Sequence, residues 1–237
     1  MVLVPGLVSV MMTFKKMLLE FTRDFVVHYV ETREKSSSLV DGQVDYSVRA
    51  IGLDIIDVIS HLGLEDHAYI AFGASLGATA MIDCYEHFQK SPHCLILLEP
   101  NAAFYYPSWS LPLIRHTAPF YRCVRPIAKW YLKNFRVNTK EDYEMYRINC
   151  RALNAADPYK LRDAVLAIAP YRIWDRLGSI RTPSLIIGAS KDTFHRHEDL
   201  LKIVSSIDSS TYLDLEKHER THSRELVGQV REYLRTL

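Results

Sequence analysis

The stretch His67–Ala80, HAYIAFGASLGATA, has residue types and a spacing that suit nucleophilic catalysis. Ser75 lies between Gly73 and Gly77 in a G-x-S-x-G pattern, after a short apolar run and before a run with helical spacing. A sharp turn from a strand into a helix exposes the serine oxygen above the end of a sheet, and glycines prevent collisions there. Free N–H groups at the helix start favour a developing anion. The alternative is a glycine-rich turn that only packs a strand on a helix.

A serine nucleophile needs a base that accepts its proton, and histidine is the usual one. The segment LEKHERTHSRE near the C-terminus offers His218 and His222. We favour His222, because it directly precedes Ser223, the expected N-cap of the last helix, and is therefore more rigidly placed. His218 is nearer the end of the preceding strand and stays the alternative. The other eight histidines, His195 and His197 included, are expected on the surface or in packing.

An acid that orients the base is expected just beyond the carboxyl end of a strand, where open α/β sheets build their sites. Asp192 lies four residues after Gly188, which ends an apolar run, and it is our first choice. Glu99 follows another apolar run and is the second choice. Since Glu99 stands before Pro100, its expected role is to end that strand.

The elements that must position these residues alternate between strand and helix patterns. This order predicts an α/β fold with a mostly parallel, doubly wound sheet and helices on both faces. Strands are expected at residues 1–4, 25–30, 69–72, 94–98, 184–188 and 211–215. Helices are expected at 13–21, 45–62 (N-cap Asp45, C-cap Gly63), 76–89, 198–207 and 223–234. Between residues 101 and 171 the alternation breaks, and helical stretches near 120–135 and 141–153 follow aromatic residues and prolines.

The sequence resembles the α/β-hydrolase superfamily, in particular esterase and lipase-like members with a helical cap. The resemblance rests on Tyr69–Ala78, on HLGL at His61–Leu64 and on TPSLIIGASKD at Thr182–Asp192. It implies a core of residues 1–100 and 172–237 with a cap at 101–171. It also implies the triad order Ser75, Asp192, then His222 or His218.

The same resemblance implies an oxyanion hole formed by the backbone N–H groups of Leu7 and Leu76. Pro5-Gly6-Leu7 stands where the family usually has a His-Gly pair, and the usual Gly-His pair near the base is absent. The chain begins at this loop, so the family's N-terminal strands are expected to be missing. Phe25–Val30 would then form a sheet edge, which a homodimer partner could cover unless the sequence is a shortened form.

Composition limits the classes of function. The 237 residues are 48% hydrophobic and carry a net charge of +1, which gives no case for nucleic-acid binding. The four cysteines, Cys84, Cys94, Cys123 and Cys150, are far apart and suit buried free thiols in a reducing, cytoplasmic compartment. The first ten residues lack the features of a signal peptide or membrane span. No metal site and no organic cofactor are expected.

Charge is unevenly distributed along the chain. The segment Pro100–Lys140 has no acidic residue and seven basic ones, Arg115, Arg122, Arg125, Lys129, Lys133, Arg136 and Lys140. Attraction to the acidic remainder of the chain is the simpler interpretation. The alternative is that this segment, which is rich in Trp and Tyr, contacts an anionic lipid surface or gathers acidic substrates.

These observations predict a serine hydrolase that cleaves a small-molecule carboxylic ester through an acyl-enzyme. The same triad can also serve lactones, thioesters or acyl transfer to another acceptor. A non-catalytic relative that binds a ligand is the alternative from a different class.

Overall fold

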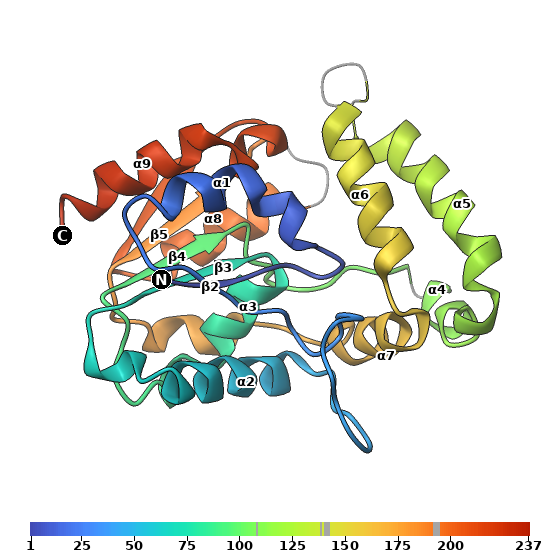
Figure 1. The fold of residues 1–237 in the computed structure, drawn as a ribbon, viewed down its shortest axis with the longest axis horizontal. Helices are drawn as coiled ribbons and strands as arrows, with labels where there is room; N and C mark the ends of the chain where they lie inside the picture. The colour runs from blue at the N-terminus through green and yellow to red at the C-terminus, as the bar shows by residue number, and fades with distance from the viewer. Residues whose placement is uncertain (108, 138, 140–142, 192–194) are drawn as a thin grey trace.

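Six parallel strands form one sheet in the computed structural model of the chain, which describes residues 1–107, 109–137, 139, 143–191 and 195–237 (Figure 1). The strand order is β2-β1-β3-β4-β5-β6, and every neighbouring pair is parallel. The strands are β1 (Val2–Val4), β2 (His28–Tyr29), β3 (Ile70–Ala74), β4 (Cys94–Leu98), β5 (Ser184–Gly188) and β6 (Ser210–Asp214). The parallel α/β sheet expected from the sequence is confirmed.

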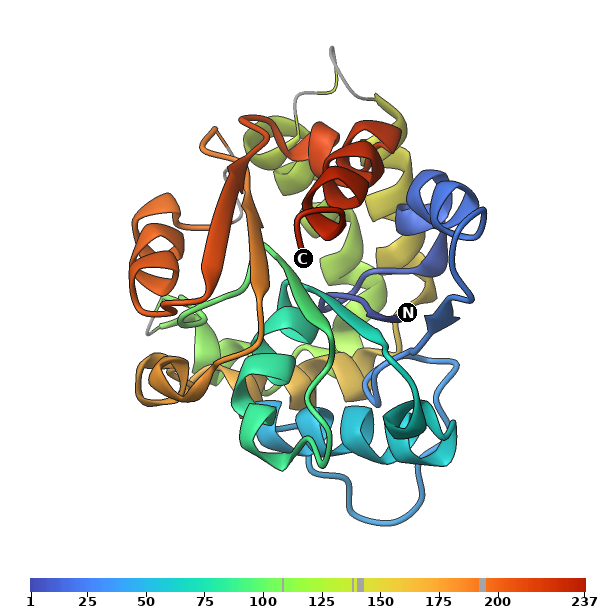
Figure 2. The ribbon, with the colours of Figure 1, turned by 90° about the vertical axis from the view of Figure 1, so that its left-hand side faces the viewer.

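Helices cover both faces of the sheet (Figure 2). Because strand side chains alternate between faces, Leu3, Phe72 and Ile96 point to one side, while Val4, Ala71 and Leu95 point to the other. The first side packs against α1 (Lys15–Phe21) and α9 (Arg224–Leu234). The second packs against α2 (Val48–His61), α3 (Leu76–Asp83) and α8 (His197–Ser205). These two apolar layers hold the strand ends in fixed positions.

Local hydrogen bonds shift some elements from their expected bounds. The strand expected at Phe25–Val30 is reduced to β2, because the N–H of Phe25 donates to the Phe21 carbonyl and extends the turn after α1. β2 nevertheless forms the expected edge of the sheet. Ser47, and not Asp45, caps α2: its hydroxyl accepts from the Ala50 N–H at 3.2 Å. The predicted homodimer through the β2 edge stays a prediction.

In its described part, the segment between β4 and β5 contains the α-helices α4 (Ser110–Ile114), α5 (Tyr121–Tyr131), α6 (Tyr143–Ala155) and α7 (Pro158–Ile168). They form the right-hand part of Figure 1, beyond the carboxyl ends of the strands. Both ends of the segment meet, because Ile173 donates its N–H to the Ala102 carbonyl at 3.0 Å and Ala103 bridges to Arg172. The domain division predicted from the sequence stays a prediction.

The cysteines differ from one another in exposure. All four are free; Cys84 and Cys94 are buried, as expected, but Cys123 is exposed on α5 and Cys150 is half-buried. The expectation that all are buried is wrong, because the helical segment has little core of its own. In the described part of the chain, no helix combines the length and the apolar character needed to cross a membrane.

Candidate active site

Ser75 occupies the sharp turn between β3 and α3 that the sequence predicts. Its backbone has φ 49° and ψ −111°, which a residue with a side chain rarely adopts. The flanking glycines permit this turn because neighbouring backbone comes very close. A Cβ on Gly77 would lie 2.4 Å from the Val4 carbonyl oxygen, and one on Gly73 would lie 2.5 Å from the Ala78 Cα. The tight packing therefore presents the serine at the carboxyl end of the sheet.

The hydroxyl of Ser75 has two polar neighbours. Asn101 Nδ2 donates to Oγ at 2.8 Å, and His195 Nε2 lies 3.1 Å from the same oxygen. Because the amide already donates to Oγ, the hydroxyl hydrogen is free to point at an unprotonated His195 Nε2. This arrangement can transfer the serine proton to the imidazole and so generate a nucleophile.

The expectation that His195 is a surface or packing residue is wrong. Its side chain is only 15% exposed and lies in the loop that leads from β5 to α8, above the end of the sheet. The sequence carried one signal for this position: His195 follows the strand that ends at Gly188 by seven residues, in the loop where the acid was expected. Asn101, two residues after Glu99, belongs to no sequence motif that predicts a site residue.

Glu99 lies at the end of β4 with a φ of 48°, and its side chain is almost fully buried. Its N–H donates to the Ile187 carbonyl, which fixes the turn. Oε2 lies 3.5 Å from His195 Nδ1 and 3.2 Å from His218 Nδ1. A carboxylate in this position can hold an imidazole ring in place and stabilise its protonated form. Ser75, His195 and Glu99 thus form a continuous polar chain.

His218 and His222 lie on one 3-10 turn after β6, and both line the same cavity as Ser75. Their ring centroids are 5.1 Å apart, and His222 Nδ1 is 2.9 Å from the Thr221 hydroxyl. The predicted partner Asp192 lies outside the described residues. The triad of Ser75 and Asp192 with either of these histidines stays a prediction.

The loop that follows β1 packs directly against Ser75. A Cβ on Gly6 would lie 3.0 Å from the Cβ of Ser75, so a larger residue would crowd the serine. The Gly6 carbonyl accepts a hydrogen bond at 2.7 Å from Nζ of Lys35, a buried side chain. Leu7 lines the cavity, and Leu76 is the first residue of α3. Leu7 therefore follows a residue that packs against Ser75, and Leu76 directly follows Ser75 in the sequence. The predicted oxyanion hole formed by their N–H groups stays a prediction.

A cavity of about 380 Å³ opens above Ser75 between the sheet and the helical segment. The polar residues that line the cavity include Ser75, Asn101, His195, His218 and His222. The walls are mostly apolar and come largely from the segment after β4: Phe104, Tyr106, Leu132, Met145 and Leu153. Burial raises the pKa of the Tyr106 phenol to about 12, so this side chain stays neutral at physiological pH. The cavity suits a small, largely apolar molecule with one polar group at the serine.

The fold is shared with known enzymes. An esterase from Thermogutta terrifontis superposes with a TM-score of 0.81 at 21% identity, covering 99% of this chain and 89% of the esterase. A hydrolase from Pseudomonas aeruginosa gives 0.83 at 19% identity over 98% and 88% of the two chains. The chain has the α/β-hydrolase fold. An enol-lactonase from Burkholderia xenovorans has the same fold, with a TM-score of 0.79 at 14% identity over 98% and 88%.

Sequence comparison adds nothing to the α/β-hydrolase fold assignment: neither a family model nor a curated protein sequence matches the chain. Identities of 14 to 21% establish the fold and leave the reaction open. The chemistry must therefore be argued from the residues around Ser75.

Proposed function

We propose that the protein is a serine hydrolase that cleaves carboxylic esters. The observation that carries the proposal is the contact of Ser75 Oγ with His195 Nε2 at 3.1 Å, at a strand-to-helix turn that opens into a mostly apolar cavity. The similarity to an esterase, a hydrolase and an enol-lactonase supports hydrolysis at a carbonyl carbon.

In the proposed reaction, Ser75 Oγ attacks the ester carbonyl carbon while His195 Nε2 takes the serine proton. The backbone N–H groups of Leu7 and Leu76 stabilise the oxyanion that forms. The intermediate then expels the alcohol, which receives the proton from the imidazolium. Water attacks the acyl-enzyme in the same way, giving the carboxylic acid and free Ser75. Glu99 keeps the His195 ring oriented and stabilises its positive charge.

A second arrangement uses the base predicted from the sequence. His218 or His222 would accept the proton, and Asp192 would orient the ring, as in the family that the sequence resembles. In a variant of this arrangement Glu99 would orient His218, whose Nδ1 lies 3.2 Å from Glu99 Oε2, against 3.5 Å for His195 Nδ1. Single variants of the three histidines distinguish the two arrangements.

The size and walls of the cavity favour a short or medium acyl group. A volume of about 380 Å³ is at the lower end for sites that bind small molecules. Lactones and thioesters present the same carbonyl carbon and are further candidate substrates. Acyl transfer would require an alcohol or amine that outcompetes water at the acyl-enzyme.

The decisive experiment is labelling with a fluorophosphonate probe, which reacts only with an activated serine. We expect labelling of the parent and none of Ser75→Ala, together with hydrolysis of short p-nitrophenyl esters in preference to long ones. Labelling that persists in Ser75→Ala would assign the activity to another residue. A parent that is neither labelled nor active would favour a non-catalytic, ligand-binding relative, and thermal-shift screening would then follow.

A further inference from the structure

The outward side of α5 is apolar, which is unusual for a helix in contact with water. Ile127 and Trp130 are 65% and 58% exposed, and Phe120, just before the helix, is 64% exposed. In the turn after α5, Phe135 lies with its ring 5.5 Å from that of Trp130 and stacks on Tyr131 at 5.4 Å. Large side chains three and four residues apart thus form one continuous exposed stripe along the helix.

Basic side chains occupy the other side of the same helix. Arg122, Arg125, Lys129 and Lys133 recur every three or four residues, on the side roughly opposite the apolar stripe. Lys129 hydrogen-bonds Asn154 of α6 at 2.7 Å. Within the described ranges, none of these four side chains forms an ion pair with a carboxylate. No carboxylate in the described part of the chain therefore neutralises their positive charge.

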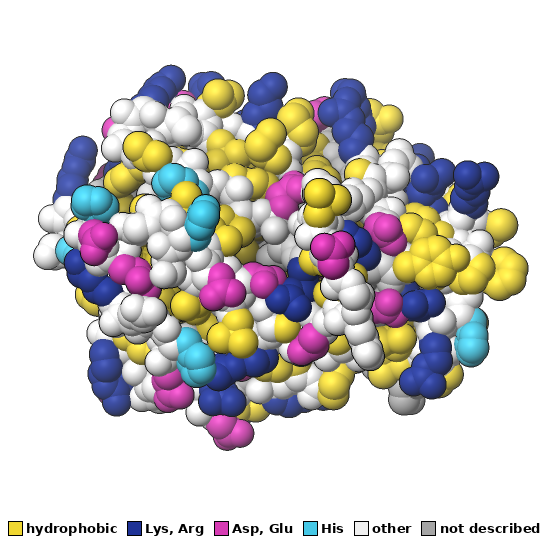
Figure 3. Space-filling view, turned by 60° about the horizontal axis from the view of Figure 1, so that its bottom comes forward, with side chains coloured by type: hydrophobic (Ala, Val, Ile, Leu, Met, Phe, Trp, Pro, Cys, Tyr) yellow, Lys and Arg dark blue, Asp and Glu magenta, His cyan; other side chains and the backbone are white. Residues whose placement is uncertain are grey.

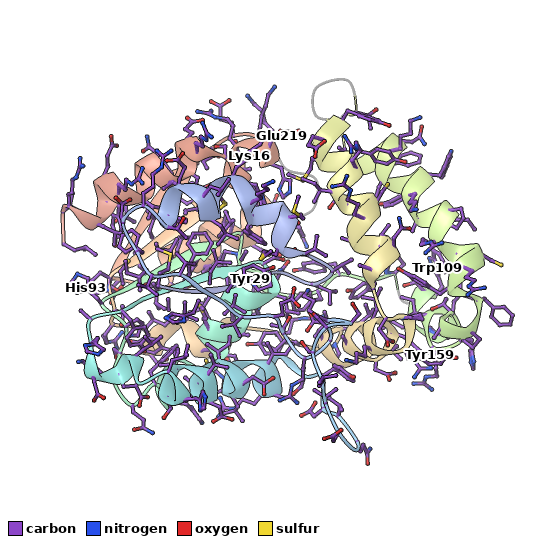
Figure 4. The ribbon with its side chains drawn as sticks, in the orientation of Figure 1. Lys16, Tyr29, His93, Trp109, Tyr159 and Glu219 are labelled. Atoms are coloured by element: carbon purple, nitrogen blue, oxygen red, sulfur yellow. The ribbon has the colours of Figure 1, made fainter. Side chains whose placement is uncertain are left out.

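The neighbouring helix α4 extends this face. Trp109 and Leu113 are 70% and 59% exposed. Figure 4 places Trp109 on the helical segment, at the opposite end of the molecule from His93. In Figure 3, hydrophobic side chains and dark blue Lys and Arg gather at the same right-hand end, which holds α4 and α5 in Figure 1. We call the exposed apolar residues Trp109, Leu113, Phe120, Ile127, Trp130 and Phe135 the cap face.

We propose that the cap face binds the surface of an anionic lipid membrane. Helices that lie in a membrane interface have Trp, Phe and Leu on one side and Lys or Arg on the other, and α5 has this composition. The rings would enter the boundary between headgroups and acyl chains. The basic side chains, with long flexible stems, would reach to the lipid phosphates. This proposal does not depend on the reaction at Ser75.

The positive charge of this segment makes a second copy of the chain an unfavourable partner for the cap face. The segment Pro100–Lys140 has seven basic residues and no acidic one, so two copies meeting through this face would bring like charges together. An anionic surface instead attracts the net positive charge of this segment. An anionic membrane would therefore both bury the apolar side chains and neutralise the surrounding positive charge.

The test is co-sedimentation of the full chain with phosphatidylcholine vesicles, with and without phosphatidylserine, at low and high salt. We expect binding that requires phosphatidylserine and is lost at high salt, with quenching of tryptophan fluorescence by brominated lipid. The double variant Trp130→Ser/Phe135→Ser should lower the partition coefficient about tenfold or more. Lys129→Gln/Lys133→Gln should lower it about tenfold at low salt.

Matched control variants distinguish binding through the cap face from nonspecific adsorption to the vesicles. Leu39→Ser removes another highly exposed apolar side chain, and Lys90→Gln removes another exposed charge, both outside the cap face. Both controls should bind as the parent does, and circular dichroism should show that all variants fold. Absence of binding, equal binding to neutral vesicles, or binding unaffected by the α5 variants would overturn the proposal. So would a dimer in sedimentation analysis that Trp130→Ser/Phe135→Ser dissociates.

Discussion

Replacing Lys35 with methionine tests how the loop beside Ser75 is held. The Lys35 side chain is 8% exposed, and its Nζ donates to the Gly6 carbonyl at 2.7 Å and lies 2.9 Å from Glu34 Oε1. Methionine retains most of the apolar stem but has no donor. The change therefore removes the partner of a buried carbonyl and of a buried carboxylate.

The expected loss of stability follows from these two contacts. A hydrogen bond from a charged donor contributes about 1.5–3 kcal/mol, and removing one partner of a buried ion pair costs about 3–5 kcal/mol. Glu34 keeps one hydrogen bond, from the Thr32 hydroxyl at 2.7 Å, but its Oε2 accepts none from the described residues. Because the two losses overlap, we expect a decrease of about 3 kcal/mol in the free energy of unfolding.

Urea unfolding measures this decrease, and the rate of fluorophosphonate labelling measures the effect on Ser75. We expect labelling to slow about tenfold, because Gly6 packs against Ser75 and a loose loop would misplace the proposed oxyanion donor of Leu7. The double variant Lys35→Met/Glu34→Gln should recover part of the stability, since no buried charge is left unpaired. It should not recover the labelling rate, because the Gly6 carbonyl still lacks its donor.

Lys191→Met is the matched control, because Lys191 pairs with Glu216 at 2.7 Å but both side chains are more than half exposed. Because both side chains are exposed to water and salt, this pair should contribute little to the free energy of unfolding. If Lys35→Met costs no more than Lys191→Met and labels at the parental rate, Lys35 does not hold the loop and our reasoning is wrong.

Three further predictions follow from single positions. His195→Ala should lower kcat/KM for a p-nitrophenyl ester at least about 100-fold, because the base would be lost. His93→Ala, at an exposed position far from Ser75, should leave kcat/KM unchanged. An unchanged kcat/KM in His195→Ala would show that another residue is the base. Gly77→Ala should destabilise the fold by about 3 kcal/mol or more in urea unfolding, because its Cβ would overlap a carbonyl oxygen, whereas Gly228→Ala, with open space around it, should not. Burial opposes ionisation of Asp214, but hydrogen bonds from the backbone of Glu216 and Ser190 outweigh it and lower its pKa below 3.8. Asp214 therefore adds stability above its unfolded pKa that is lost as the pH falls through the folded pKa, and Asp214→Asn should flatten the fall in Tm below pH 4.

Much of the sheet follows from local sequence. The strands Cys94–Leu98 and Ser184–Gly188 have the bounds predicted for them. Cys94–Leu98 is apolar throughout and Leu185–Ile187 forms the apolar centre of the other strand, as expected for strands buried on both faces of a parallel sheet. The edge strand is different. Phe25–Val30 is equally apolar, but a backbone hydrogen bond from Phe25 to Phe21 uses its first residue in a turn, and two residues pair with β1.

In the candidate site, too, some residues follow from a local sequence pattern and others only from the tertiary structure. Ser75 and its glycines were identified from five consecutive residues, because the constraint on the turn is local. His195 is 120 residues further along the chain, and its distance from Ser75 depends on where the β5–α8 loop lies. Glu99 was the second choice for the acid, and only its position between His195 and His218 draws attention to it.

The sequence by itself determined the α/β class, the sharp turn at Ser75 and the strand ends at which candidate site residues gather, since these depend on periodicity and on steric limits within a few residues. The tertiary structure decided which histidine contacts Ser75, which carboxylate lies behind it and that Lys35 bonds Gly6. It also decided that α5 turns its apolar side outward. Each of these depends on the packing of segments far apart in the chain, and no local pattern encodes the distance between two loops.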